Sequence, residues 1–339
     1  MKRFALSLIA ALFCVAAVRA QQLSVTYEGK NGPGKGKNIV FLSGDEEYRS
    51  EEGLPMLAKI LSERHGFTCT VLFSVDASGV IDPNSGGSIT DPEKMDKADA
   101  IVMLLRFRHW PDEAAKHFEA ALNRGVPIVG LRTSTHAFDF GGKDTPNSAY
   151  KKWQWNNKEG GFGRIVLGET WVNHWGSHKK EATKAIIEES AKGDPLLNGV
   201  SDVFVTTDVY EAHPVANVKV LLRGQVLKGM TPNDEPADYK KKAKGASEEQ
   251  GVNSPMMPIA WSREYKNEAG KTNKILCTTM GAASDLVNVG LRRLVVNGIY
   301  WGLGLPVPDA ANVEIVGPYT PTMYGFKGFK PGVKPSDLK

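Results

Sequence analysis

Strand-like and helix-like segments alternate between residues 38 and 131, and this order constrains the fold more than any other feature of the chain. Four apolar runs have the length of buried strands, at residues 38–42, 67–73, 98–105 and 127–131. A helical repeat of apolar residues separates the first run from the second and the third from the fourth, and a glycine follows each repeat, Gly66 or Gly125. Strand–helix–strand units form parallel sheets with helices on both faces. The sequence therefore predicts an α/β fold with a mostly parallel sheet.

The second half of the chain is less regular but contains further strand candidates. They lie at residues 164–167, 203–206, 218–222, 257–261 and 274–279, and a last helix is predicted over 291–301. No linker separates two complete domains, so we expect one α/β domain over residues 38–316. Composition also predicts an exposed insertion loop at about 231–254, a flexible lead-in over 21–37 and an extended C-terminal tail over 317–339.

The N-terminus resembles a secretory signal peptide. Lys2 and Arg3 precede an apolar run over residues 4–18, and the small side chains of Val18 and Ala20 have the spacing of a cleavage site. The run is shorter than the roughly 20 residues that a membrane-spanning helix needs. We expect cleavage after Ala20, export to the periplasm or beyond the cell, and no membrane attachment of the mature chain.

Charge and cysteine usage argue against several classes of protein. The formal net charge is +4 over 339 residues, and the predicted signal peptide carries three of the positive charges. This balance does not favour nucleic acid or an anionic membrane surface as a partner. Cys14 belongs to the predicted signal peptide. Cys69 and Cys277 lie in apolar runs, which favours buried thiols over a disulfide.

The segment VPIVGLRTSTHAF, residues 126–138, has the pattern of a nucleophile elbow without its nucleophile. Arg132 stands where the nucleophile is expected, and a guanidinium cannot act as a nucleophile or base near neutral pH. One hypothesis is that Arg132 binds oxygen atoms of a substrate beside His136, which would act as an acid or base. The alternative is that Arg132 pairs with one of the acidic residues 45–47.

Polar turns follow three of the predicted strands, and parallel strands bring such turns to one edge of the sheet. The turns are SGDEEYRS (43–50), RFRHWPD (106–112) and RTSTHAF (132–138). An acid of the first turn could act as a base on a substrate held by Arg49, although the helix dipole alone also favours acids there. Spacing does not choose among the acids, and Glu47 is taken as the substrate-binding candidate together with Arg49.

The segment NHWGSH, residues 173–178, contains two histidines four positions apart. This spacing suits a metal site on a helix, but Gly176 favours a turn, in which His174 and His178 would be surface residues. Trp175 could stack on the apolar face of a sugar ring. His174 is therefore a catalytic candidate and Trp175 a substrate-binding candidate.

The segment TTDVYEAHP, residues 206–214, combines acidic, tyrosine and histidine side chains. Asp208 and Tyr210 point the same way in an extended chain, so they could share a pocket. Asp208 would then act as an acid or base, and Tyr210 would donate a hydrogen bond. A plain strand and turn is the alternative interpretation.

The order and spacing of these segments resemble the ThuA-like, trehalose-utilisation family of the class I glutamine-amidotransferase-like superfamily. The resemblance runs from about residue 38 to residue 303 and includes the late segments KILCTTMGAASD and LRRLVVNGIYWGLG. It implies a flavodoxin-like sheet and a role in sugar metabolism, with oxidised (keto) glycosides as expected substrates. The site residues that it implies are Arg132, His136, His174, Asp208 and Tyr210.

The chain departs from the family pattern at two points. The superfamily's glutaminases carry a cysteine at the elbow and the ThuA-like branch typically carries a histidine, whereas this chain has Arg132. Glutamine hydrolysis is therefore not expected. Many relatives also carry a histidine after a late Met/Leu-Gly pair, where this chain has Ala282 after Met280 and Gly281.

We expect an exported protein that acts on a carbohydrate by acid/base chemistry without a cysteine nucleophile. The catalytic candidates are His174, Asp208 and His136, and the substrate-binding candidates are Arg132, Trp175, Tyr210, Glu47 and Arg49. One alternative is a sugar-binding module without catalysis. Another is a metal-dependent hydrolase that uses His174, His178 and either Asp208 or His213. No cofactor is predicted apart from the divalent metal of that alternative, and the sequence does not predict an oligomeric state.

Overall fold

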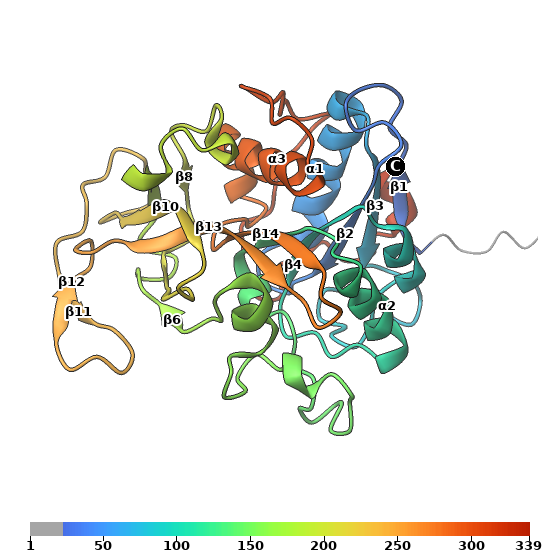
Figure 1. Ribbon diagram of the computed structural model, residues 1–339, viewed down its shortest axis with the longest axis horizontal. Coiled ribbons are helices and arrows are strands. Elements are labelled where there is room, and N and C mark those ends of the chain that lie inside the picture. Colours follow the sequence, from blue (N-terminus) through green and yellow to red (C-terminus); the bar gives the residue numbers. More distant parts are fainter. Residues whose placement is uncertain (1–22) are drawn as a thin grey trace, which may run out of the picture.

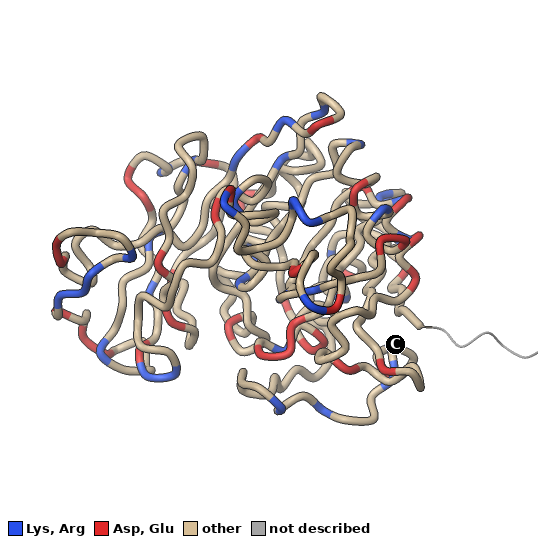
Figure 2. Tube along the Cα trace, turned by 90° about the horizontal axis from the view of Figure 1, so that it is seen from below, with Lys and Arg blue, Asp and Glu red and all other residues tan. Residues whose placement is uncertain are grey.

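The computed structural model describes residues 23–339 (Figure 1). The predicted signal peptide and Cys14 lie outside these residues. No helix in the described part of the chain is long and apolar enough to cross a membrane. Basic and acidic residues are interspersed along the chain (Figure 2). Cys69 and Cys277 are buried free thiols, as predicted.

Five parallel strands form one half of a ten-stranded sheet. In spatial order they are β3 (Thr68–Phe73), β2 (Asn38–Gly44), β4 (Ala100–Leu105), β5 (Ile128–Leu131) and β14 (Thr272–Thr278). This is the strand order of flavodoxin-like folds, in which the connections reverse direction between β2 and β4. The predicted α/β, flavodoxin-like fold is therefore confirmed.

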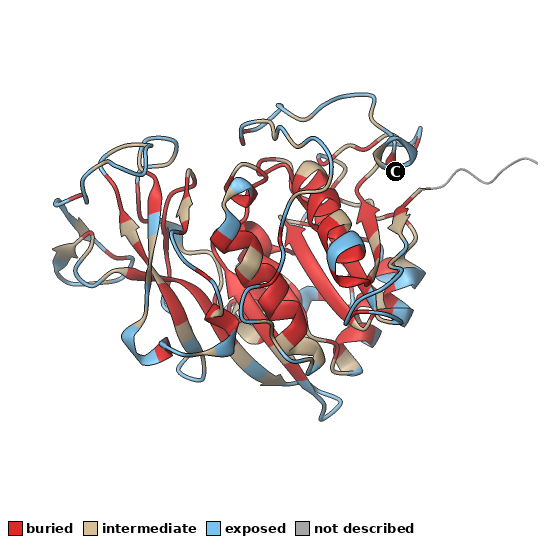
Figure 3. Ribbon diagram, turned by 90° about the horizontal axis from the view of Figure 1, so that it is seen from above, coloured by how far each residue is buried: buried red, intermediate tan, exposed pale blue. Residues whose placement is uncertain are grey.

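Helices cover both faces of the parallel strands (Figures 1 and 3). α1 (Ser50–His65) and α3 (Val289–Leu303) pack in one apolar cluster, and α2 (Asp112–Asn123) packs in another. Neighbouring residues of β2 alternate between the two clusters, since Phe41 belongs to the first and Leu42 to the second. This alternation places the clusters on opposite faces of the sheet.

The remaining strands extend the sheet by antiparallel pairing. Beyond β14 come β13 (Met257–Lys266), β10 (Lys219–Val226), β7 (Thr183–Ile187) and β8 (Phe204–Val205), and β1 (Val25–Tyr27) pairs with β3 at the other edge. Two small sheets pair β6 (Asn173–His174) with β9 (Tyr210–Glu211) and β11 (Lys240–Lys242) with β12 (Glu249–Gly251). Short 3₁₀ turns occur at Pro92–Lys97, Arg132–His136, Lys151–Trp153, Glu189–Ala191, Pro195–Leu197, Asp285–Val287 and Pro335–Leu338.

The strand predicted at residues 164–167 is wrong, because Gly163–Leu167 form a π-helical turn. The turn ends at Gly168, whose φ of 98° is accessible to glycine at little cost. The carbonyl of Leu167 accepts a hydrogen bond from Trp261 Nε1 (2.7 Å). The apolar residues of this segment therefore enter the core from a turn, without strand pairing.

Three segments predicted as loops or tails are ordered parts of the fold. In the lead-in, β1 pairs with β3, and the Tyr27 hydroxyl donates to the carbonyl of Leu338 (2.6 Å). In the insertion, β11 and β12 form a hairpin, and Val252 is buried. The C-terminal segment, residues 317–339, packs against α1 and ends near β1 (Figure 1). Contacts with distant parts of the chain fix these segments, and local composition does not reveal such contacts.

Candidate functional site

Side chains from several loops converge on a pocket at the carboxyl ends of the parallel strands. Together with the open space at its mouth, the pocket has a volume of about 240 Å³, and it is lined by Glu47, Tyr48, Arg106, Phe107, His136, Trp171, His174 and Tyr210. The loops after β2, β4 and β5 supply part of this lining, and the region of β6 and β9 supplies the rest. The pocket therefore lies at the topological switch point between β2 and β4, where flavodoxin-like folds bind ligands.

A larger cavity, of about 840 Å³ with the open space at its mouth, lies between α1 and the C-terminal segment. No histidine is among the described residues that line it. The smaller pocket is the candidate site because hydrogen-bonded histidines and carboxylates with shifted pKa values converge beside it.

The backbone around the pocket is strained at three residues. Arg49, Phe107 and Arg132, which follow β2, β4 and β5, have positive φ angles of 58°, 51° and 42°. Such conformations cost about 1–3 kcal/mol each in residues other than glycine and are typical of functional sites. The sharp turn predicted at Arg132 is therefore present, and its N–H donates to the carbonyl of Met280 (3.0 Å).

Arg132 is fully buried and pairs with Asp208 rather than with the acidic residues 45–47. Its Nη2 donates to Asp208 Oδ1 (2.9 Å), and its Nη1 donates to the backbone carbonyl of Asp208 (2.7 Å). The guanidinium carbon lies 3.8 Å from the centroid of the Tyr210 ring and 4.8 Å from that of Tyr48. None of its surface is exposed, and it does not line the pocket, in contrast to the predicted contact with a substrate. Arg132 instead holds Asp208.

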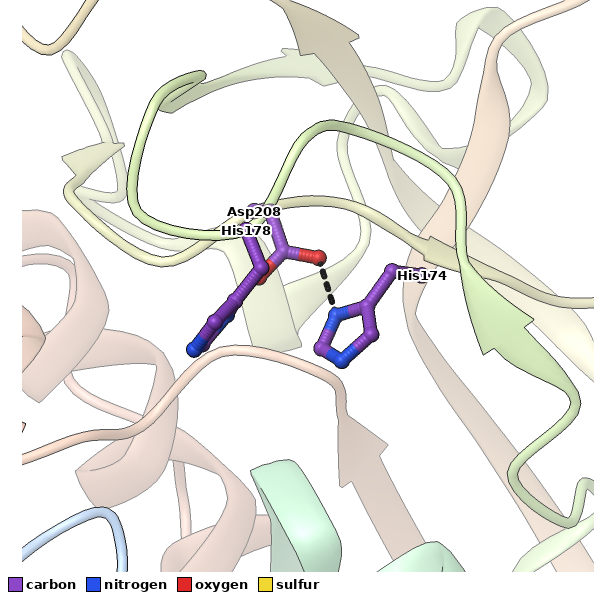
Figure 4. Close-up of side chains that lie close together, drawn as sticks. All are labelled: His174, His178 and Asp208. Atoms are coloured by element: carbon purple, nitrogen blue, oxygen red, sulfur yellow. Dashed lines mark hydrogen bonds and ion pairs between the residues drawn. The ribbon is translucent and has the colours of Figure 1, made fainter. Parts of the chain in front are cut away.

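Asp208 is the centre of a hydrogen-bond network beside the pocket (Figure 4). Its Oδ2 accepts from His174 Nδ1 (2.7 Å), and its Oδ1 accepts from His178 Nδ1 (2.9 Å). His178 Nε2 in turn donates to Glu47 Oε1 (3.1 Å). Burial alone would raise the pKa of Asp208, but the Arg132 guanidinium and the two histidines outweigh it and lower this pKa well below its usual value. The carboxylate is therefore ionised at neutral pH.

The two histidines of the network differ in their partners and in access to the pocket. Hydrogen bonds to Asp208 and Glu47 raise the pKa of His178 to about 9, so its ring is a cation at neutral pH. The other ring nitrogen of His174, Nε2, makes no hydrogen bond within residues 23–339 and points away from Asp208 in Figure 4. Because His174 Nδ1 donates to the ionised Asp208, Nε2 is the ring nitrogen that is left to act as a base.

His136 lines the pocket as an uncharged imidazole. Burial and the positive charges of Arg106 and Arg132 hold its pKa well below the usual value. Its Nδ1 lies 3.2 Å from the Thr135 hydroxyl. His136 can therefore form hydrogen bonds with a ligand, but because its pKa is lowered it takes up a proton poorly near neutral pH.

Trp171, and not Trp175, supplies the indole surface of the pocket. Trp175 is buried in the core, where its Nε1 donates to the carbonyl of Val252 (2.7 Å), in contrast to the predicted place at a sugar ring. Trp171 is half-buried, with its ring centroid 5.9 Å from that of His174 and 6.4 Å from that of Tyr210. Its place in a polar loop three positions before His174 was the available sequence signal.

Arg49 and His213 are not brought to the pocket. Arg49 is buried, and its guanidinium donates to the carbonyls of Glu46 and Gly325. In this structure its guanidinium thus contacts the C-terminal segment, whereas the sequence predicted a contact with a substrate. His213 pairs with Glu211 (3.2 Å) and lines a different cavity, so it does not join His174 in a metal site.

Besides Trp171, sequence reasoning missed three pocket residues, Tyr48, Arg106 and Phe107. The Tyr48 hydroxyl accepts from Arg132 Nη2 (3.2 Å) and from the Tyr210 hydroxyl (3.4 Å), so its own hydrogen is available to a ligand. Arg106 keeps 19% of its side chain exposed while it pairs with Glu46. All three missed residues lie in the predicted polar turns, but spacing did not distinguish them from their charged and aromatic neighbours.

His174, His178 and Asp208 also have the donor types of a metal site, and one ligand atom from each lies within 4.8 Å of the others. Two imidazoles and a carboxylate suit zinc or ferrous iron. Both Nδ1 atoms and the Arg132 guanidinium nevertheless already donate to this carboxylate. These contacts fit a hydrogen-bond network around Asp208 better than a metal centre. The same three side chains would hold the metal if one bound.

The cationic state of His178 predicts how stability depends on pH. Its pKa rises from 6.5 to about 9 on folding, so its stabilising effect is complete below pH 6.5 and is lost as the pH rises through 9. In chelator-treated protein, we expect wild type to exceed His178→Gln in free energy of unfolding by a margin that shrinks across this range. Urea denaturation at stepped pH measures the margin. A margin that stays constant would contradict the assignment.

Comparisons with known proteins identify the family of the chain. The model of the ThuA family, described as trehalose utilisation, matches residues 38–302. Among solved structures, a ThuA-like protein from Bacteroides uniformis has 16% identity and a TM-score of 0.47, over 81% of this chain and 94% of that one. A ThuA-like protein from Parabacteroides merdae has 15% identity and a TM-score of 0.49, over 81% and 92%. No curated protein matches the chain.

The family match extends from the first parallel strand, β2, almost to the end of α3 and includes every residue of the Asp208 network. The family's description indicates a role related to carbohydrates. The chain belongs to the ThuA, or trehalose-utilisation, family.

Proposed function

We propose that this protein binds a carbohydrate in the pocket and moves a proton on it with the His174–Asp208 pair. The proposal rests on one observation, the available Nε2 of His174, which lies at an aromatic pocket and is backed through Nδ1 by a buried carboxylate. An imidazole in this setting acts as a general base near neutral pH, and the carboxylate stabilises the imidazolium that forms. The family's description supports a carbohydrate as the ligand.

A glycoside that carries a ketone suits this arrangement. Removal of a proton from the carbon beside a ketone needs a base and hydrogen-bond donors for the oxygen that becomes negative. His174 Nε2 is the base, and the Tyr48 hydroxyl and the Arg106 guanidinium are the donors. Burial raises the pKa of Tyr48 well above its usual value, which keeps its hydroxyl protonated. The resulting enolate either takes the proton back from the His174 imidazolium at carbon, which gives isomerisation, or expels the glycosidic oxygen from the next carbon, which then takes up that proton. Neither route needs a nucleophile.

His178 and Glu47 position the reacting pair in this proposal. His178 carries both ring protons at neutral pH, so it does not act as the base. It connects Asp208 to Glu47, and Glu47 lines the pocket. A carboxylate held in this way can accept a hydrogen bond from a sugar hydroxyl while one oxygen binds His178.

A metal-dependent hydrolase is the second candidate function, because the ligand atoms of His174, His178 and Asp208 lie close enough to bind one ion. A divalent metal would supply electrophilic activation of a substrate oxygen or a bound water. Metal analysis of protein purified without a histidine tag distinguishes the two candidates. One equivalent of zinc or iron that is lost in His178→Gln would favour the hydrolase.

Binding to keto-trehalose tests the proposed function, using the mature chain that we propose to be exported, residues 21–339. A ligand at 100 times its Kd adds about 2.7 kcal/mol to the free energy of unfolding, which a thermal-shift assay detects. We expect Trp171→Ala to weaken binding by about 2–10-fold, the usual range for one aromatic contact. Trp175→Phe is the matched control and should lower stability without lowering affinity. Absence of binding, or loss of affinity in the Trp175 variant alone, would refute the pocket assignment.

A further inference from the structure

The C-terminal segment, residues 317–339, reaches the rim of the pocket although it lies outside the family match at residues 38–302. It is tied to the start of α1 by Thr322, whose N–H and hydroxyl donate to the two carboxylate oxygens of Glu52 (2.6 Å each). These are charge-assisted hydrogen bonds, which are stronger than neutral ones. The segment therefore follows a defined course as it approaches the pocket.

The next residues of the segment contact the pocket wall directly. The Tyr324 ring stacks on the Tyr48 ring with centroids 5.4 Å apart, and the Tyr324 hydroxyl donates to the carbonyl of Thr206 (2.8 Å). The N–H of Gly325 donates to the carbonyl of Glu47 (2.8 Å). Tyr48 and Glu47 both line the pocket, so the position of the segment is coupled to that of two pocket residues.

Arg49 holds the segment at a second point, residues 325–328. The Arg49 guanidinium donates to the carbonyl of Gly325 and lies against Gly328, where a Cβ atom would come within 2.2 Å of Arg49 Nη2. The backbone can therefore approach the guanidinium this closely because residue 328 is glycine. Phe326 lies between Gly325 and Gly328, which both contact Arg49, so its backbone is held on both sides.

Phe326 adds a ring to a row of aromatic side chains along the pocket. Its side chain is 56% exposed, and its ring centroid lies 5.1 Å from the guanidinium carbon of Arg106, which also lies 4.5 Å from the Phe107 centroid. The Trp155 ring lies 5.2 Å from Phe107 and 6.2 Å from Trp171, centroid to centroid. Aromatic rings and one guanidinium thus form a continuous row along the pocket.

We propose that Trp155 and Phe326, the two members of this row that do not line the inner pocket, extend the pocket into a subsite for the second sugar ring of a disaccharide, and that Phe326 determines the preference for two rings over one. The inference rests on the proposed function. Without the open space at its mouth the inner pocket has a volume of only about 40 Å³, below the roughly 300–1,000 Å³ of sites for larger ligands, so a second ring must lie outside it. Aromatic faces stack on the apolar side of a sugar ring, and a guanidinium donates to its hydroxyls.

Isothermal titration with two keto-glycosides tests this subsite. Keto-trehalose presents two rings, and keto-methyl-glucoside presents the same reacting ring without the second one. We expect wild type to bind keto-trehalose more tightly, and Phe326→Ala to lose about 2–10-fold of that affinity while its affinity for keto-methyl-glucoside is unchanged. Met323→Ala is the matched control, because Met323 lies on the same segment with 49% exposure and should leave both affinities unchanged.

The outcomes separate the subsite from the proposed function. If wild type binds both glycosides and Phe326→Ala binds both equally well, the subsite is refuted and the proposed function stands. An equal loss of both affinities in Phe326→Ala would also overturn the preference for a second ring, since it would show a general effect on the pocket. If wild type binds neither glycoside, both proposals fail.

Discussion

Replacing His174 with glutamine is expected to lower kcat/KM toward keto-trehalose by about 10²–10⁴-fold, the usual contribution of a general base. Glutamine can keep a hydrogen bond to Asp208 and much of the side-chain volume, but it cannot take up a proton. KM should change little, because the lost interaction belongs to the transition state. Steady-state kinetics of wild type and variant measure both parameters.

The control for this substitution is His117→Gln. His117 lies on α2, where it pairs with Asp96 (2.8 Å), and it does not line the pocket. This variant should retain the wild-type kcat/KM. Turnover by His174→Gln within a few-fold of wild type would mean that another group moves the proton.

The second large effect is expected on stability. Asp208→Asn should lower the free energy of unfolding by about 3–5 kcal/mol, because it removes one partner of a buried ion pair and leaves the Arg132 charge uncompensated. Urea denaturation near neutral pH measures the change. The loss should be smaller in the double variant Arg132→Met, Asp208→Asn, from which the unpaired cation is also absent.

Asp96→Asn is the matched control for the buried carboxylate. Asp96 also binds a histidine, but its side chain is 45% exposed. Exposed pairs of this kind contribute about 0–1 kcal/mol, so the control should stay close to wild type. A loss of less than about 1 kcal/mol in Asp208→Asn would contradict the view that Arg132 depends on this carboxylate.

The parallel half of the fold could be predicted because its strands are recognisable one at a time. β4 is apolar and buried throughout, and glycine or polar turns mark the ends of such runs. β7, over residues 183–187, mixes lysine with small and branched residues and is half-exposed, so no period separates it from a loop. It becomes a strand by pairing with β10, nearly forty residues further on. Such pairings are set by packing across the sheet, which a local pattern does not contain.

The site could be predicted as a region but not side chain by side chain. Parallel strands bring the turns after β2, β4 and β5 together, and this follows from the strand order. The directions in which the Arg132 and Trp175 side chains point do not follow from the strand order. Both have the chemistry of ligand-binding residues, yet their partners Asp208 and Val252 lie 76 and 77 residues away in the sequence. These long-range contacts turn the two side chains into the protein, and Trp171 and Arg106 line the pocket in their place.

Deuterium exchange is the most direct measurement of proton transfer by His174. Keto-trehalose is incubated in D₂O with wild type or with His174→Gln, and NMR follows the hydrogen on the carbon beside the ketone. Wild type is expected to introduce deuterium at this carbon, in the glycoside or in its product, while the variant leaves exchange at the rate of buffer alone. Equal exchange by both proteins, or binding by wild type without any exchange, would contradict the assignment of His174 as the base.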